Sequence, residues 1–212
     1  MKLRSIVLLG SIAVSLAACS KGNSSPDCGS CLIPLSAGNV WVYQDSVFDR
    51  PGVLNSTYVD SMTVSQSTTN LNGLNYYGVQ DPQGWFGPSG YLAVNPINSA
   101  IFGLDSLNGD PFLFFGTALW DWTVLGVSSD FSNPVCIGTF TQYGFYNTAN
   151  VEGYDCQVNI GYVVDCNNVT TEEIVYYVCP GVGVIRIEDY TTDRFNNLFL
   201  DYSQTLRSTA IR

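Results

Sequence analysis

Apolar and polar residues alternate along residues 156–166, and this alternation constrains the fold more than any other feature of the sequence. In an extended strand, one face would carry Cys156, Val158, Ile160, Tyr162, Val164 and Cys166, and the other would carry Gln157, Asn159, Gly161 and Asp165. Val163 alone departs from the pattern. A period of two is typical of a β-strand with two different faces.

The same alternation recurs along the rest of the chain, with turn residues between the runs. Beyond the N-terminal segment, no long stretch has apolar residues at helical spacing. We expect further strands at 40–48, 56–67, 75–79, 91–95, 120–127, 136–146, 174–179, 184–190 and 198–205. About ten strands joined by short turns predict an all-β fold, a single antiparallel sheet strongly curved into a half-barrel or a sandwich.

The N-terminus carries a targeting signal. Lys2 and Arg4 precede about a dozen mostly apolar residues, a length typical of a secretory signal and too short for a spanning helix. Leu16-Ala17-Ala18-Cys19 resembles the lipobox of bacterial lipoproteins. The resemblance implies cleavage before Cys19 and acyl chains on its thiol and amino group, which together hold a protein durably at a membrane. Plain secretion with an unpaired Cys19 is the alternative.

The segment after the signal divides the chain into three parts. We expect a signal peptide at 1–18, a flexible tether rich in Ser, Gly and Asn at 19–30, and a single β-rich domain at 31–212. Ser20 after the lipidated cysteine resembles an outer-membrane sorting signal. The predicted location is therefore the cell envelope, with the outer membrane favoured and the leaflet left open.

Charge and composition exclude several functions. The chain has 18 acidic and 8 basic residues and a net charge of −10, and cleavage would remove two of the basic ones. Nucleic acid and anionic headgroups would be repelled. The sequence has no histidine, and Lys21 in the tether is the last lysine. Ser-His-Asp and Cys-His catalysis, His-ligated zinc and a Schiff-base lysine in the domain are therefore excluded.

No cofactor or metal is expected, and carboxylates are the remaining candidates for catalysis. The acids of residues 105–110 do not have the spacing of a calcium loop. Glu172 and Glu173 are adjacent, so they would lie on opposite faces of a solvated strand end. Asp81, Asp110 and Asp130 lie in turn-like contexts. We therefore expect no enzymatic activity, and a carboxylate-based hydrolase is an alternative.

Two short motifs resemble the β-rich domains of Bacteroidetes-type cell-envelope lipoproteins. Residues 34–43, PLSAGNVWVY, are similar to their Pro-Leu-x-x-Gly-x-x-Trp-x-Tyr opening, and residues 176–185, YYVCPGVGVI, to their Tyr-x-x-x-Pro-Gly-Val-Gly turn. Trp41 and Tyr43 would share one face of a first strand, and Gly181 would supply a turn. The resemblance implies a fold and a location, and it carries no catalytic residues.

The cysteines predict disulfides. Lipidation would use one of seven and leave six: Cys28, Cys31, Cys136, Cys156, Cys166 and Cys179. Three disulfides are expected in an oxidising compartment. Cys28 and Cys31 would form a local bridge. A two-residue turn at Asn167-Asn168 would place Cys156 opposite Cys179 and leave Cys136 for Cys166, while a longer loop would allow Cys166 to pair with Cys179.

Residues 80–91, QDPQGWFGPSGY, are the predicted ligand-facing loop. Its prolines and glycines would present Trp85, Phe86 and Tyr91, which could stack on sugar rings or fold back over the core. We expect a lipid-anchored, non-enzymatic envelope lipoprotein that binds an apolar or glycan ligand or supports an envelope assembly. A carbohydrate-binding accessory module and the hydrolase are the alternatives.

Overall fold

The computed structural model describes residues 32–81, 90–95, 100–104, 112–115, 122–127, 138–164, 169–193 and 195–211, and all of its regular structure is β. The strands are β1 (Val40–Arg50), β2 (Val53–Leu71), β3 (Leu74–Gln80), β4 (Tyr91–Val94), β5 (Ile101–Leu104), β6 (Phe112–Phe115), β7 (Trp122–Val127), β8 (Gly138–Val151), β9 (Tyr154–Val164), β10 (Thr170–Cys179), β11 (Gly183–Thr192) and β12 (Leu198–Ala210). The described chain contains no helix that could cross a membrane. The all-β prediction is confirmed, and β5 and β6 are strands that it missed.

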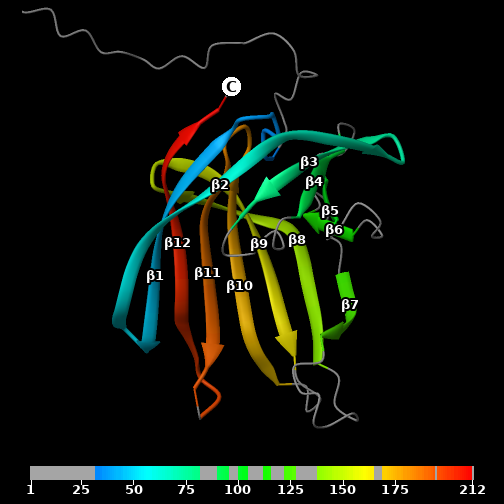
Figure 1. Cartoon of the computed structure of the whole chain (residues 1–212). Coiled ribbons are helices and arrows are strands. Elements are labelled where there is room, and N and C mark those ends of the chain that lie inside the picture. The colour runs from blue at the N-terminus through cyan, green and yellow to red at the C-terminus, as the bar shows by residue number, and fades with distance from the viewer. Residues whose placement is uncertain are drawn as a thin grey trace, which may run out of the picture.

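The twelve strands form one antiparallel sheet. Their order is β6-β5-β4-β3-β2-β1-β12-β11-β10-β9-β8-β7, so β6 and β7 are its end strands in the described chain. The first and last strands are neighbours, because β1 pairs with both β2 and β12. The prediction of a single antiparallel sheet is therefore confirmed (Figure 1).

The pairing of β9 with β10 has the register that a tight turn at Asn167-Asn168 predicts. Val158 lies opposite Tyr177 and Gln157 opposite Val178, although the turn itself lies outside the described residues. The polar side of β9 is also buried, since Asn159 is 1% exposed and lies opposite Tyr176. The sheet thus buries polar as well as apolar side chains along this strand.

The two motifs found in the sequence contact each other. Trp41 is fully buried, and its Nε1 donates a hydrogen bond to the carbonyl of Val182 (2.6 Å). The hydroxyl of Tyr43 donates to the carbonyl of Val184 (3.1 Å). Both aromatic rings therefore reach from β1 across β12 to the β10–β11 turn and the start of β11. Their predicted role in the core is confirmed.

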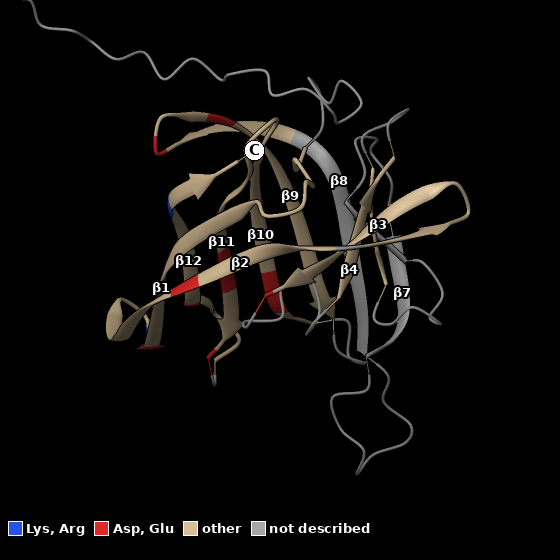
Figure 2. Ribbon diagram, turned by 45° about the horizontal axis from the view of Figure 1, so that its top comes forward, with Lys and Arg blue, Asp and Glu red and all other residues tan. Residues whose placement is uncertain are grey.

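Residues from strands that are far apart in the sheet order lie close together in space. Asp81, directly after β3, acts on the pKa of Tyr176 in β10, although β2, β1, β12 and β11 lie between these strands in the sheet order. A flat sheet would separate them by about 24 Å. In Figures 1 and 2, β2 passes in front of β12, β11 and β10 on its way to β3. Closure into a half-barrel or a sandwich stays a prediction.

One core cluster joins residues of these distant strands. It contains buried residues of β1–β5, β10 and β11 and of the segment before β1, among them Ile33, Trp41, Met62, Leu92, Ile101, Val178 and Ile187. Each of these seven side chains is at most 2% exposed. These seven described side chains are therefore closed to solvent.

Candidate functional site: carboxyls and tyrosines of the inner face

On several strands, acidic residues lie on the same face of the sheet as buried core residues. We call the sheet face that carries Tyr43 and Tyr176 the inner face. Asp45 follows Tyr43 by two residues on β1, and Asp60 of β2 lies opposite Tyr43. On β11, Asp189 follows the core residue Ile187 by two. Because side chains alternate along a strand, these acids share the inner face. Acidic segments are visible on β2, β10 and β11 in Figure 2.

Asp45 is the most deeply buried acid. Its side chain is fully buried, and its Oδ1 accepts a hydrogen bond from the hydroxyl of Tyr202 (2.6 Å). Its Oδ2 has no hydrogen-bond partner, and neither does the buried Oδ2 of Asp60. Burial and the charge of Asp60 raise the pKa of Asp45, although hydrogen bonds from Tyr202 and Gln204 act against this. The carboxyl is therefore held in an environment that disfavours its charge.

A second group of acids, which we call the acidic row, crosses three neighbouring strands. It consists of Glu172 on β10, Asp189 on β11 and Asp201 on β12, all half-buried. Burial, with the charges of Glu172 and Asp201, raises the pKa of Asp189 to about 7. Burial and Asp201 also raise the pKa of Glu172. Because like charges disfavour each other, this row retains a proton near neutral pH.

Tyrosines accompany both groups of acids. Burial raises the pKa of Tyr43 and of Tyr176 far above the ordinary value, and the charge of Asp81 adds to both shifts. Asp189 is a further negative neighbour of Tyr176. These phenols therefore stay protonated and can act as hydrogen-bond donors, but not as bases.

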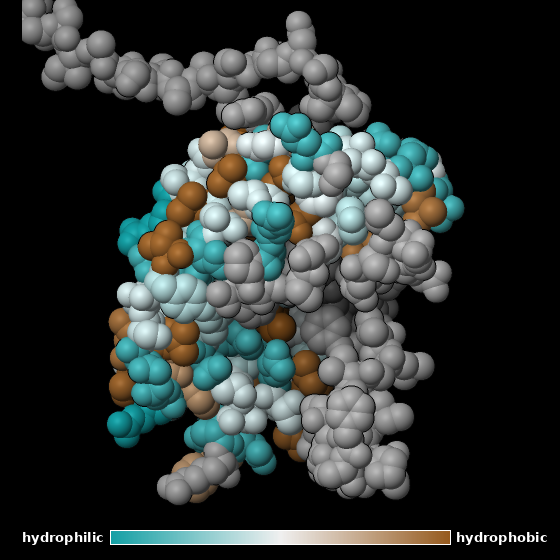
Figure 3. Space-filling model, viewed as in Figure 1, coloured by the Kyte–Doolittle hydropathy of each residue, from teal (hydrophilic) through white to brown (hydrophobic). Residues whose placement is uncertain are grey.

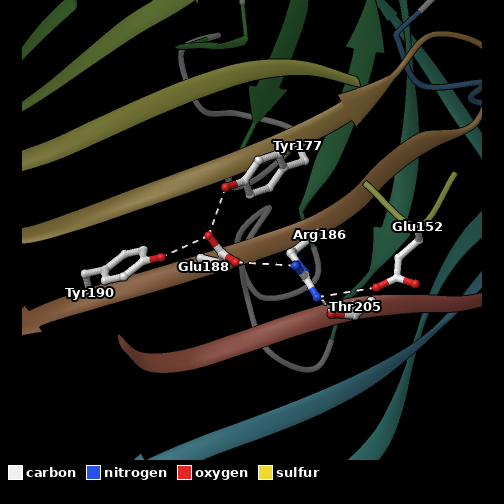
Figure 4. A network of polar contacts seen from close by, with 6 residues as sticks. All are labelled: Glu152, Tyr177, Arg186, Glu188, Tyr190 and Thr205. Carbon is white, nitrogen blue, oxygen red and sulfur yellow. Dashed lines mark hydrogen bonds and ion pairs between the residues drawn. The ribbon is translucent and has the colours of Figure 1, made fainter. Parts of the chain in front are cut away.

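The arginines of the described chain do not neutralise the inner face. Arg186 lies on the opposite face, where it contacts Glu152 (3.5 Å) and Glu188 (3.6 Å) and donates to Thr205 Oγ1 (3.2 Å). Glu188 also accepts hydrogen bonds from Tyr177 and Tyr190 (Figure 4). Arg207 donates to Gln44, and Arg50 is exposed at the end of β1. The acidic row thus remains without a basic partner among these residues.

Two interpretations of the acids from sequence are wrong. Glu172 and Glu173 were expected at a solvated strand end, but both are half-buried and burial raises the pKa of each. Asp81 was expected in a solvated turn, but it is 7% exposed and acts on two core tyrosines. Side-chain burial depends on contacts with residues far away in the sequence, and a local sequence context cannot show these. Asp110 and Asp130 lie outside the described residues.

The described acids are not arranged to bind a metal ion, but they meet one requirement of acid–base chemistry. Within the described chain, no three acidic or cysteine side chains are grouped so that they could hold a metal ion. Glu172 and Asp189 do meet one requirement of carboxylate catalysis, since both have a raised pKa and each is near another acid. Binding a ligand through its hydroxyl groups requires fewer precisely placed groups than catalysis does. Ionised carboxylates accept hydrogen bonds and protonated carboxylic acids also donate them, so the half-buried acids offer both.

The predicted ligand-facing aromatics are only partly placed. Tyr91 begins β4, as the predicted strand at 91–95 has it, and it is half-buried and packs against the core cluster of Tyr76, Ala93 and Leu104, which is the alternative in which it folds back over the core. Trp85 and Phe86 lie outside the described residues.

Two of the predicted disulfide cysteines are described. Cys156 is buried and Cys179 half-buried, and both are free thiols, so the expected bridge between them is absent from the structure. They are nevertheless close: burial and the neighbouring Cys179 raise the pKa of Cys156 to about 11. The β9–β10 ladder ends one pair before them, at Gln157 and Val178. The other predicted positions, Cys19, Cys28, Cys31, Cys136 and Cys166, lie outside the described residues.

Comparison with known proteins adds little. No protein-family model matches the sequence, and no curated protein is significantly similar to it. Two solved structures resemble the chain, each over 85% of this chain and 99% of the other. One is a predicted lipoprotein of Parabacteroides distasonis (16% identity, TM-score 0.41), and the other a predicted exported protein of Bacteroides fragilis with a YmcC-like fold (12% identity, TM-score 0.43). Likenesses this remote carry no functional argument.

Proposed function

We propose that this protein is a lipid-anchored lipoprotein of the cell envelope whose inner face binds a glycan without turnover. The membrane contact would be made by acyl chains on Cys19, with the outer membrane as the favoured location. The location rests on the signal sequence that ends in Leu-Ala-Ala-Cys and on the resemblance of two short motifs to envelope lipoproteins. Neither nucleic acid nor a cofactor has a part in this function.

The acidic row is the observation that carries the choice of ligand. Glu172, Asp189 and Asp201 are half-buried and have no described basic partner, and the hydroxyl of Tyr176 lies near two of them. Carboxylates accept short, strong hydrogen bonds from hydroxyl groups, which a glycan supplies in pairs. An apolar ligand is less favoured, because the described side chains of the core cluster are buried against one another.

A carboxylate-based hydrolase is the second candidate, and one observation favours it. The pKa of Asp189 is raised to about 7 beside Glu172, as a general acid would require. Glycoside hydrolysis also needs a second carboxyl across a cleft from the first. The carbohydrate-binding accessory module stays a third possibility, which depends on Trp85 and Phe86.

Substitutions in the acidic row, with the adjacent Glu173 as control, test the proposed glycan binding. The soluble chain beginning after Cys19 would be applied to a glycan array and, in parallel, to glycoside and ester substrates. We expect binding without hydrolysis, and we expect Glu172→Gln and Asp189→Asn to weaken binding at least tenfold. Glu173→Gln is the matched control, since Glu173 is adjacent but on the other face, and it should bind like the wild type.

The outcomes separate the candidates. If the wild type hydrolyses a substrate, and Glu172→Gln and Asp189→Asn abolish hydrolysis with folding intact, the protein is a hydrolase and not a binding protein. Binding that survives both substitutions but is lost in Trp85→Ala would favour the accessory module. An apolar ligand that binds while every glycan fails would show that the polar part of the inner face is not the site.

A further inference from the structure

Within the described chain, the first half of β2 lies at an edge of the sheet. β1 pairs with β2 from Val53 to Thr63, but β3 pairs with β2 only from Thr63 onward. Residues 53–62 therefore have a strand neighbour on one side only within the described chain. A strand edge of this kind presents main-chain donors and acceptors that fit another extended strand.

Seven residues of this edge, 53–59 with sequence VLNSTYV, are all solvent-exposed, and we call them the edge strip. Its apolar side chains are Val53 (41% exposed), Leu54 (52%), Tyr58 (38%) and Val59 (65%). Natural edges of this length usually carry lysine, proline or another charged residue that blocks pairing. The edge strip contains none, and Arg50 and Asp60 are the charged residues nearest to its two ends.

The edge strip is also self-complementary about Ser56. In an antiparallel pair centred on Ser56, Val53 lies opposite Val59 and Leu54 opposite Tyr58. Asn55 then lies opposite Thr57, so apolar residues meet apolar ones and polar meet polar. A slip of two residues would place Val59 opposite Asn55. The same register puts Arg50 of one copy at the end where Asp60 of the other lies.

We propose that two copies of this chain pair through their edge strips, antiparallel about a two-fold axis at Ser56, and so join their sheets into one. We expect the partner strand to come from a second copy, because the sequence of the edge strip is symmetric about Ser56. The edge strip contains no charged residue, so two acidic chains can meet there without repulsion between like charges. The Tyr58 carbonyl already accepts a hydrogen bond from Gln44 (3.0 Å), so part of this edge is satisfied within the chain.

The pairing is expected to be weak in free solution. A ladder of seven residues buries less than the roughly 1,200 Å² typical of a stable complex. Two copies anchored in one membrane would meet at a much higher effective concentration. The test therefore uses the full-length chain in the membranes of the cells that express it.

Cysteine substitutions read out the register directly. After mild oxidation, Ser56→Cys should give a reducible dimer well above the wild-type background, since the two positions would be directly opposite. Thr57→Cys, one residue away and equally exposed, should give none by itself. Asn55→Cys and Thr57→Cys expressed together should cross-link. Val59→Lys added to Ser56→Cys should abolish the dimer.

The opposite results would overturn the proposal. Equal cross-linking of Ser56→Cys and Thr57→Cys would mean random collision rather than a defined register. No dimer from Ser56→Cys in a folded, membrane-bound chain would exclude self-pairing. A reducible adduct of Ser56→Cys with a different protein, and none with itself, would assign the edge strip to a strand from another partner.

Discussion

Trp41 donates a 2.6 Å hydrogen bond to the main chain of Val182, although 141 residues separate the two in the sequence. The contact ties β1 to the β10–β11 turn and lets the indole lie directly against Gly183. A methyl group at Gly183 would meet Trp41 Nε1 at 3.2 Å, and the φ angle of Gly183 is +107°. The turn therefore requires glycine for its conformation and for the space beside Trp41.

Gly183→Ala should accordingly destabilise the protein more than Gly181→Ala. Both positions have positive φ, but nothing lies within 4 Å of a methyl at Gly181. We expect a loss of about 1 kcal/mol at Gly181 from the φ angle and about 2–4 kcal/mol at Gly183, where crowding is added. Urea unfolding of the two variants measures the difference. Equal losses would mean that Trp41 moves aside without cost.

Tyr202→Phe should remove the hydrogen bond that supports the buried Asp45 carboxyl. The expected loss is about 1.5–3 kcal/mol, as for hydrogen bonds to charged groups, and the pKa of Asp45 should rise further. Tyr190→Phe is the matched control, because it removes a similar bond to the half-buried Glu188, and it should cost less. In the Asp45→Asn background, the effect of Tyr202→Phe should shrink if the two residues act together.

The strands and their pairing follow from local features of the sequence. Period-two alternation predicts the face of Trp41 and Tyr43, and a tight turn at Asn167-Asn168 predicts the β9–β10 register. The first prediction holds because it depends on neighbours in the chain. The second holds for the pairs from Glu172 to Val178, although the register shifts by one residue between Thr170 and Glu172, next to the turn. The short strands β5 (IFGL) and β6 (FLFF) were missed because they contain no polar residue with which apolar ones could alternate.

The acids of the inner face could not be predicted in this way. Asp81 reads as a turn residue and Glu172 as a strand end, but Asp81 is buried and Glu172 half-buried in the folded sheet. A weaker signal was present: Trp41, Tyr43 and Asp45 alternate on one strand, so an acid continues a row of buried aromatics. The burial of Asp45 is therefore better predicted by its position two residues after Tyr43 than by the residues directly beside it.

Cys156 and Cys179 should form a disulfide when the mature chain is oxidised. The β9–β10 register places them at the next pair of the ladder, and opposite residues of antiparallel strands have Cα atoms within the range of a disulfide. Peptide mapping of the oxidised protein checks the bond, and its loss should cost about 3 kcal/mol. Cys28→Ala with Cys31→Ala should cost little. Thiol labelling that finds both Cys156 and Cys179 free after oxidation would contradict the prediction.

Cys19→Ser should release the protein from the membrane fraction or leave it as uncleaved precursor. The physical reason is that the predicted attachment depends entirely on acyl chains carried by this residue. Fractionation with mass spectrometry of the mature N-terminus provides the measurement. Unchanged membrane association, together with an N-terminus that carries no acyl mass, would contradict the anchor. Ser20→Ala is the control and should keep the acyl chains.

The protein should become less stable as the pH rises from about 5 to 8. The pKa of Asp189 is raised from 3.8 to about 7, so the folded state holds a proton that the unfolded state releases at lower pH. The stability from this proton is complete below the unfolded pKa and is lost as the pH rises through about 7. The raised pKa values of Glu172, Glu173 and Asp45 act in the same direction.

Asp189→Asn tests the cause of this pH dependence, because asparagine keeps the shape of the side chain and cannot release a proton. Urea midpoints of wild type and variant, measured at intervals from pH 5 to pH 8, give the comparison. We expect the wild-type midpoint to fall with pH and the variant's to fall less, with the largest difference above pH 7, where the wild-type carboxyl is charged beside Glu172 and Asp201. Parallel curves for the two proteins would show that Asp189 does not carry the effect.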